Sequence, residues 1–173
     1  MECDKQYGNR QIETITAEEL LKMEFPEPKF SVKNLIQEGA TLFAGTPKRG
    51  KSWFALQLAV AVSQGKFFLG NIPTKKLGVL YLALEDHKRR LKDRLQTLNK
   101  LGEIQDQANL IFSTEISRAS DGGLDMIDKF IQTHTEFGLV IIDTLAKFRM
   151  PSRGKASYQD DYRTIDQLKE IAL

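Results

Sequence analysis

The sequence predicts an α/β fold in which a mostly parallel sheet is covered by helices on both faces. Short apolar runs alternate with segments of helical periodicity, an order that favours right-handed crossovers between parallel strands. Two of these runs, at 78–84 and 139–142, are continuously apolar rather than alternating, which is typical of strands buried on both faces. With 173 residues, of which 41% are hydrophobic, the chain is long enough for one compact domain.

The first thirty residues form a separate N-terminal part in this interpretation. Residues 1–12 are polar and are expected to form a flexible tail. Thr16 and Glu19 are spaced as a capping box that opens a short helix, which the FPEP segment ends. Residues 31–40 are expected to be a linker. The predicted division is therefore a tail with a short helix at 1–30 and a core at 31–173.

The order of elements in the core follows from the same patterns. A β-prone run at 41–45 leads through a glycine-rich loop to a helix with Phe54, Leu58, Ala61 and Val62 at helical spacing, ended by Gly65. After a turn at 67–78 and the first buried strand, an amphipathic helix is predicted at 87–102. The remaining elements are, in order, a strand at 108–115, a helix ended by Gly138, the second buried strand, a polar loop at 150–161 and a helix at 162–173.

The loop after the first β-prone run carries the strongest functional signal. Gly45, Gly50, Lys51 and Ser52 fill every fixed position of the G-x-x-x-x-G-K-[ST] phosphate-binding motif. A strand before it and a helix after it are the context that this motif requires. The alternative is a basic surface turn, since glycine and lysine are common there. The expected nucleotide-binding residues are Gly45, Thr46, Pro47, Lys48, Arg49, Gly50, Lys51, Ser52 and Trp53.

The motif also indicates which groups would meet a bound nucleotide. Backbone N–H groups of the loop and of the helix N-terminus would surround the phosphates of ATP. The ammonium of Lys51 would lie on the β- and γ-phosphates, and the Ser52 hydroxyl would be a ligand of Mg²⁺. Lys48 and Arg49 are either solvated loop cations or further phosphate contacts.

Acidic residues follow both buried strands, where ligands bind in open parallel sheets. Asp143 closes the second run and is the expected second ligand of Mg²⁺. Thr144 follows it, so the carboxylate that activates water has to come from another strand. Glu85 is the leading candidate for this general base. Asp86 is a competitor, although it could instead be the N-cap of the next helix.

Composition restricts the remaining function classes. A formal net charge of +2 gives no argument for nucleic-acid binding by charge alone, and one cysteine, Cys3, excludes a disulfide framework. His87 and His134 have no spacing typical of a metal site and are expected to be solvated helix residues. Neither a secretory signal nor an apolar run of membrane-spanning length is present, so a cytoplasmic protein is expected, without a membrane partner.

Four runs of the sequence resemble RecA-like P-loop ATPases, and among them the RepA-type hexameric replicative helicases of plasmids and phages. These runs are LFAGTPKRGKSWFALQLAVAVSQG, FFLG, VLYLALEDHKRRLKDRL and LVIIDTLAKF. The catalytic glutamate at the end of the strand after the P-loop helix is the arrangement of this branch, which includes RecA, DnaB and KaiC. The resemblance spans residues 30–173. It implies a homo-hexameric ring that binds ATP between subunits and single-stranded DNA in its centre.

By motif match, the resemblance gives catalytic roles to Glu85 and Lys51 and metal roles to Ser52 and Asp143. Arg94 occupies a place where the family tends to keep an arginine, or it is one cation of a solvated helix face. In the family, the last helix is followed by strands that carry a polar sensor and an arginine finger. The chain is therefore expected to lack the C-terminal strands of the core, to bind ATP and to hydrolyse it slowly.

Two other functions fit the same fold. A nucleotide-dependent assembly or regulatory ATPase of the KaiC-like type would associate without an effect of DNA, and a small-molecule kinase would need an acceptor lid that is not evident. The loop at 150–162, with Arg153, Lys155 and Tyr158 and with Arg149 directly before it, is the expected contact to single-stranded DNA, unless it is an ordinary solvated loop.

Overall fold

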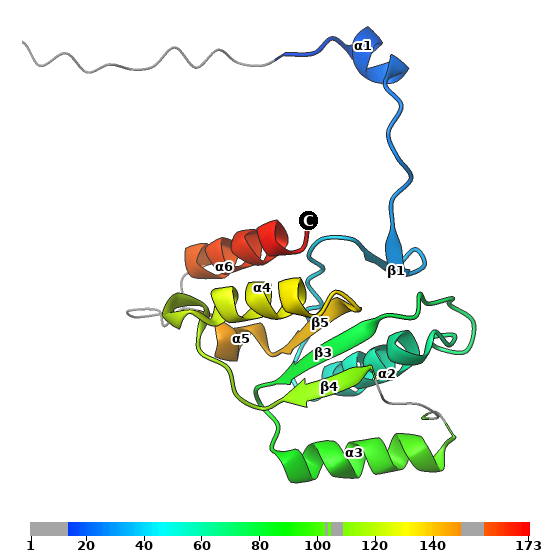
Figure 1. The fold of residues 1–173 in the computed structure, drawn as a ribbon, viewed down its shortest axis with the longest axis vertical. Helices are drawn as coiled ribbons and strands as arrows, with labels where there is room; N and C mark the ends of the chain where they lie inside the picture. Colours follow the sequence, from blue (N-terminus) through cyan, green and yellow to red (C-terminus); the bar gives the residue numbers. More distant parts are fainter. Residues whose placement is uncertain (1–13, 103, 105–108, 150–157) are drawn as a thin grey trace, which may run out of the picture.

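The computed structural model describes residues 14–102, 104, 109–149 and 158–173, and the side chains of 158–161 are outside this description. From α2 to α5 its α-helices and strands alternate along the chain (Figure 1). In chain order they are α1 (Ala17–Lys22), β1 (Phe30–Val32), β2 (Ile36–Gln37), α2 (Lys51–Gln64), β3 (Gly78–Ala83), α3 (Lys88–Lys100), β4 (Leu110–Ser113), a 3₁₀ turn (Ala119–Asp121), α4 (Gly123–Thr133), β5 (Phe137–Asp143), α5 (Leu145–Phe148) and α6 (Tyr158–Ile171).

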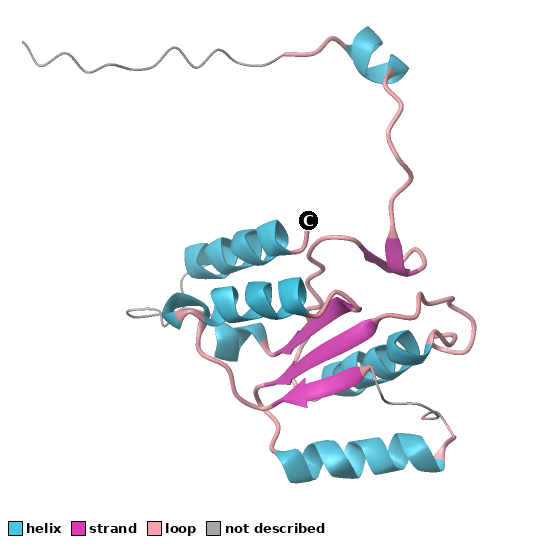
Figure 2. Cartoon of the chain, viewed as in Figure 1, coloured by secondary structure: helices cyan, strands magenta, loops and turns pink. Residues whose placement is uncertain are grey.

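A three-stranded parallel sheet forms the centre of the domain, in the order β4-β3-β5 (Figure 2). The central strand β3 is buried along its whole length, as its continuous apolar sequence predicts. Leu80 of β3 is in register with Ile111 of β4 and with Val140 of β5. The carboxyl ends of all three strands consequently lie at one edge of the sheet, where the acidic residues were predicted to meet.

Helices cover both faces of this sheet, which confirms the predicted α/β class. Because successive side chains of a strand point to opposite faces, β3 contributes to two separate cores. Val79, Tyr81 and Ala83 pack with α2 and α3 on one face. Leu80 and Leu82 pack with α4, α5 and α6 on the other.

Helix α2 begins and ends at glycines in the left-handed conformation. Gly50 is its N-cap with φ of 86°, and Gly65 is its C-cap with φ of 68° and donates its N–H to Ala61 and Val62. Glycine is preferred at both positions because a Cβ is unfavourable at positive φ. The predicted end at Gly65 is therefore confirmed.

The β-prone run before the loop does not form the predicted strand. Residues 41–46 have no strand structure and are exposed. A strand needs a partner for its backbone groups, and none of the described strands pairs with this run. Phe43 instead stacks on Phe54 of α2, with ring centroids 4.6 Å apart. This aromatic contact attaches the run to the domain without a β-ladder.

Three further sequence predictions are wrong in detail. The predicted linker at 31–40 contains the antiparallel pair β1 and β2. The helix expected to end at Gly138 ends at Thr133, and Gly138 lies within β5, which begins at Phe137. Most of β5 is only half-buried, because it is an edge strand of the described sheet. The predicted tail at 1–12 and Cys3 lie outside the described residues.

Candidate nucleotide-binding site

The phosphate loop opens directly into the first turn of α2. Residues 45–50 are exposed, and no side chain caps the helix N-terminus. Its first N–H groups therefore remain available to an anion, which a helix dipole also favours. Positive φ angles at Lys48 (62°) and Gly50 (86°) curl the loop, and backbone of alternating handedness of this kind turns N–H groups inward. A Cβ at Gly50 would meet nothing within 4 Å, so conformation rather than space favours glycine there.

The Lys51 side chain folds back over the same loop. Its Nζ donates hydrogen bonds to the carbonyl oxygens of Gly45, at 2.7 Å, and of Thr46, at 2.8 Å. The ammonium is consequently held against the backbone of the loop. These residues fit a phosphate chain, because a cation lies against the loop that leads into a helix N-terminus for which the described residues provide no side-chain cap.

The N-terminus of α2 lies toward the carboxyl ends of the strands. At its other end, the Val62 carbonyl accepts from the Leu77 N–H, and the Ala61 carbonyl accepts from the Thr74 hydroxyl. The helix thus ends beside the start of β3 and runs antiparallel to it. Trp53, in the first turn, lies 5.6 Å from the guanidinium of Arg94 in a cation–π contact.

Asp143 ends β5, and Glu85 lies two residues after the end of the neighbouring strand β3. Ala83 is in register with Asp143, and the Leu84 N–H donates to the Asp143 carbonyl at 2.7 Å. The Thr144 hydroxyl then donates to Oε1 of Glu85 at 2.9 Å. Thr144 therefore orients an exposed carboxylate at this edge. The sequence pattern predicts no role for Thr144, although a hydroxyl directly after the second acid is a signal for one.

Asp143 is on the face of the sheet that α2 covers. It is two residues after Ile141, which packs in the same core as α2, and side chains alternate with a period of two. Its Oδ2 accepts a hydrogen bond from the Tyr81 hydroxyl at 2.9 Å. This role of Tyr81 is not predictable from the sequence, because an apolar strand gives no sign that its tyrosine contacts an acid.

Asp86 has a structural environment that differs from that of Glu85. Its side chain is 7% exposed and forms ion pairs with Arg90, at 3.0 Å, and with Arg94, whose side chain is 17% exposed. The α3 N-cap is His87, which accepts from the Arg90 N–H, so the predicted N-cap role of Asp86 is wrong. Arg94 is likewise not a cation of a solvated face: it links Asp86 to Trp53.

Asp86→Ala is expected to lower the free energy of unfolding by about 2 to 3 kcal/mol, because it leaves a largely buried guanidinium without its partner. Chemical denaturation would measure the change. Glu18→Ala is the matched control: it breaks an i,i+4 ion pair with Lys22 in which both side chains are more than 70% exposed, worth a few tenths of a kcal/mol. Equal effects of the two substitutions would contradict the structural role of Asp86.

Burial and the carboxylate of Asp143 raise the pKa of Tyr81 above its ordinary value. Above pH 10 the unfolded chain loses the Tyr81 proton while the folded chain keeps it, so this group lowers stability as pH rises. Above pH 10 we expect Tyr81 to lower the free energy of unfolding by about 1.4 kcal/mol per pH unit, and we expect this contribution to be absent in Tyr81→Phe. Unfolding free energies measured between pH 9 and 11 test this. Tyr162→Phe, which leaves Tyr81 in place, should keep the wild-type slope.

The histidines, the helix lengths and the expected DNA-binding loop were also subjects of sequence predictions. His87 and His134 cap helix ends and are exposed, and no group of three or more His, Cys, Asp or Glu side chains in the described part of the chain could hold a metal ion. Within that part, no helix has the length and apolar composition needed to span a membrane.

Arg153 and Lys155 of the expected DNA contact lie outside the described residues. Tyr158 begins α6 rather than belonging to a loop.

The chain has a glycine-rich loop at the start of a helix, and this helix packs on a parallel sheet with two acids at the carboxyl ends of its strands. This combination defines a P-loop ATPase domain that binds nucleotide. The comparison with protein families agrees: a model described as an AAA domain matches residues 9–173. This match spans nearly the whole chain, so the protein belongs to that AAA domain family. A search of curated proteins finds no match.

Proposed function

We propose that this protein is the motor subunit of a replicative DNA helicase of a plasmid or phage-like element, acting as a homo-oligomeric, hexameric ring on single-stranded DNA. Residues 31–173 would form its RecA-like ATPase core. One observation carries the proposal. The acid that can activate water, Glu85, follows β3, whereas Asp143 ends the neighbouring strand β5. This is the arrangement of the RecA-like branch that the sequence resembles.

The phosphate-binding role belongs to the loop and to the first turn of α2. Lys51 Nζ already lies against the loop carbonyls, so a short movement of its flexible side chain would exchange these acceptors for phosphate oxygens. Ser52 and Asp143 are the groups that would hold Mg²⁺, through a hydroxyl and a carboxylate on the same face of the sheet. Bound Mg²⁺ would neutralise charge on the β- and γ-phosphates.

Glu85 would accept the proton of the attacking water. Its carboxylate is exposed, and the Thr144 hydroxyl holds one oxygen in place, which leaves the other free to accept a hydrogen bond. Asp86 cannot take this role without giving up its pairing with two arginines. The hydroxyl of Thr144 is therefore a positioning group for the base, as Tyr81 is for Asp143.

The test is ATP hydrolysis with and without single-stranded DNA. A motor of this type should hydrolyse ATP several-fold faster when DNA is present, and it should bind labelled single strands more tightly with a non-hydrolysable ATP analogue than with ADP. Nucleotide-dependent self-association with no effect of DNA would contradict the helicase and support an assembly ATPase. Phosphate transfer to a metabolite would instead indicate a kinase.

A further inference from the structure

A group of lysines lies at the far end of α2, away from the phosphate loop. Residues 39–84 contain six lysines and arginines and no acidic residue. The phosphate loop and the first turn of α2 carry three of these cations, and the other three are Lys66, Lys75 and Lys76. Helix α2 has 14 residues and is therefore about 20 Å long. The nucleotide site consequently gives no reason for the lysines at its far end.

Contacts between the end of α2 and the segment before β3 hold Lys66 beside Lys76. The Thr74 hydroxyl donates a hydrogen bond to the carbonyl oxygen of Lys66 at 2.7 Å. The backbone at Gly65 approaches the same segment so closely that a Cβ added there would lie 2.8 Å from the Cβ of Lys76. These two lysines therefore start from neighbouring points of the backbone.

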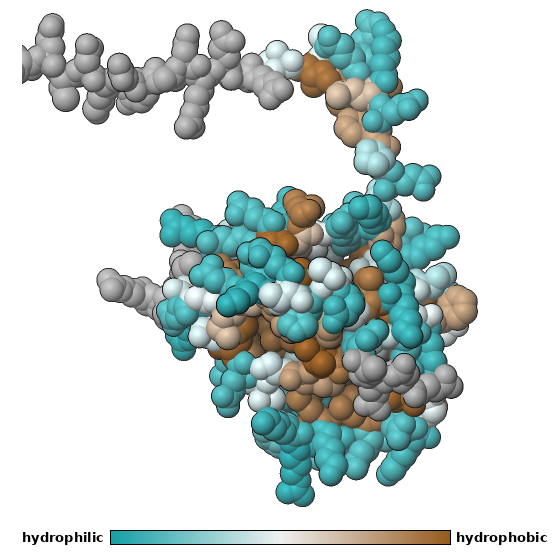
Figure 3. Space-filling model, in the orientation of Figure 1, coloured by the Kyte–Doolittle hydropathy of each residue, from teal (hydrophilic) through white to brown (hydrophobic). Residues whose placement is uncertain are grey.

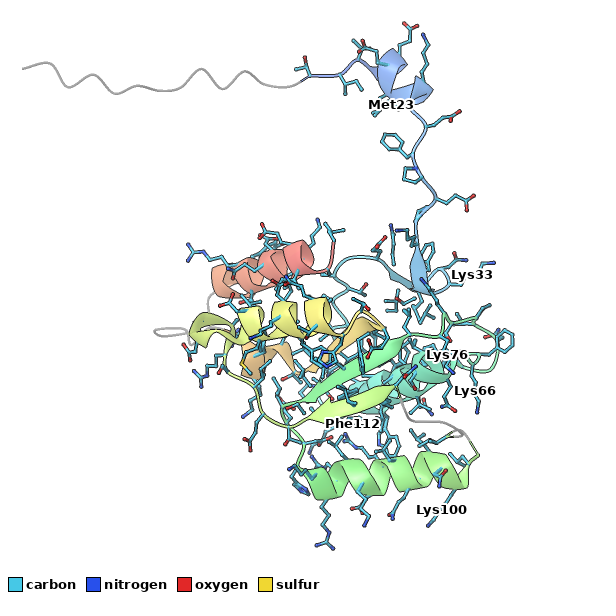
Figure 4. All side chains as sticks on the ribbon, viewed as in Figure 1. Met23, Lys33, Lys66, Lys76, Lys100 and Phe112 are labelled. Carbon is cyan, nitrogen blue, oxygen red and sulfur yellow. The ribbon has the colours of Figure 1, made fainter. Side chains whose placement is uncertain are left out.

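The turn between β1 and β2 adds Lys33 to this group. Its N–H donates to the Pro73 carbonyl at 3.0 Å, and the Lys75 N–H donates to a carbonyl of β1 at 2.9 Å. Figure 4 shows Lys33, Lys66 and Lys76 on the same side of the molecule. Lys33, Lys75 and Lys76 are exposed and form no ion pair within the described residues. Their charge is therefore not neutralised by the rest of the described chain.

Exposed apolar side chains follow Lys66 directly. Phe67 is 65% exposed and Leu69 is 59% exposed. Phe68, between them, is buried, and its ring centroid lies 5.0 Å from that of Phe54 in α2, so it anchors the turn. In Figure 3, this side of the body shows hydrophilic side chains in teal beside light brown ones. An aromatic ring that is held outward next to cations can stack on an unpaired base.

We infer that the amino-edge surface, made of Lys33, Lys66, Phe67, Lys75 and Lys76, binds single-stranded nucleic acid. It is a second contact, separate from the nucleotide site and from the loop expected to bind DNA. Its lysines meet backbone phosphates as point charges, and Phe67 stacks on a base. A duplex keeps its bases paired and stacked inside, so it offers no base to Phe67. The inference goes beyond the proposed motor, because this binding requires neither ATP nor hydrolysis.

The experiment measures binding of fluorescein-labelled oligothymidine to the whole chain by anisotropy, without nucleotide. Lys75→Glu combined with Lys76→Glu should weaken binding at least tenfold. It should also lower the slope of log affinity against log salt by about 1.4, because two phosphate contacts are lost. Lys88→Glu combined with Lys92→Glu is the matched control, since it makes the same charge change at two exposed lysines of α3. Equal effects of the two pairs would overturn the inference, as would a wild type that does not bind.

Replacing Phe67 by alanine tests the stacking contact. This substitution should weaken binding by about fivefold or more, because a base loses its aromatic partner. Phe25→Ala is the matched control, since Phe25 is 68% exposed and lies outside the amino-edge surface. Equal affinities of Phe67→Ala and Phe25→Ala would contradict stacking on Phe67. Duplex bound as tightly as the single strand would contradict it as well.

Cross-linking then locates the contact and separates it from other partners. An oligonucleotide with 5-bromodeoxyuridine, irradiated on wild type, should label the tryptic peptide 67–75, which ends at Lys75. Label confined to other peptides would overturn the inference while leaving the proposed helicase untouched. Lysine-dependent binding to phosphatidylserine vesicles, without binding of oligothymidine, would instead indicate a membrane surface. Labelled peptide 67–75 without any effect of DNA on ATP hydrolysis would support the inference and contradict the helicase. A normal thermal unfolding transition for each variant excludes misfolding as the cause.

Discussion

Replacing Glu85 by glutamine is expected to lower the rate of ATP hydrolysis by a factor of about 10² to 10⁴ while nucleotide affinity stays near that of wild type. Glutamine keeps the size of the side chain and can still accept from the Thr144 hydroxyl, but its amide cannot take a proton from water. The phosphate loop is separate from this carboxylate, so binding should be retained. Single-turnover hydrolysis and a binding titration measure the two quantities independently.

Glu115→Gln is the matched control for this substitution. Glu115 is exposed and lies two residues after the end of β4, just as Glu85 lies two residues after the end of β3. Its replacement should leave hydrolysis unchanged. A large rate loss in Glu115→Gln or in Asp86→Asn, with Glu85→Gln active, would show that the wrong acid has been assigned.

Replacing Lys51 by alanine is expected to weaken ATP binding by roughly 10- to 150-fold. The ammonium is held against the phosphate loop by the carbonyls of Gly45 and Thr46, and a hydrogen bond to a charged group contributes about 1.5 to 3 kcal/mol. A titration with a fluorescent ATP analogue would give the dissociation constants of both proteins.

Lys76→Ala removes the same charge at the far end of α2, beside Gly65, and should bind the analogue as wild type does. This control separates a specific phosphate contact from a general loss of positive charge. Unchanged affinity in Lys51→Ala would contradict the nucleotide site itself. An equal loss in Lys76→Ala would show that net charge, rather than the loop, determines affinity.

The sequence by itself determined the features that depend on local pattern. The spacing of Gly45, Gly50 and Lys51 identified the loop, and Gly65 marked the end of α2, because glycine relieves a conformational restriction that acts within a few residues. The continuous apolar run of β3 predicted burial on both faces and the α/β class. The acidic ends of β3 and β5 likewise followed from the position of polar residues after apolar runs.

Only the tertiary structure decided what depends on residues far apart in the chain. Glu85 and Asp86 are adjacent in sequence and chemically alike, yet Thr144, 59 residues away, contacts the first, whereas Arg94 of the next helix neutralises the second. The contact of Tyr81 with Asp143 spans 62 residues. The run at 41–45 has strand propensity, but none of the described strands pairs with it, because a β-ladder needs a partner that propensity cannot supply. Side-chain pattern thus fixes the local conformation, and packing selects which polar groups meet.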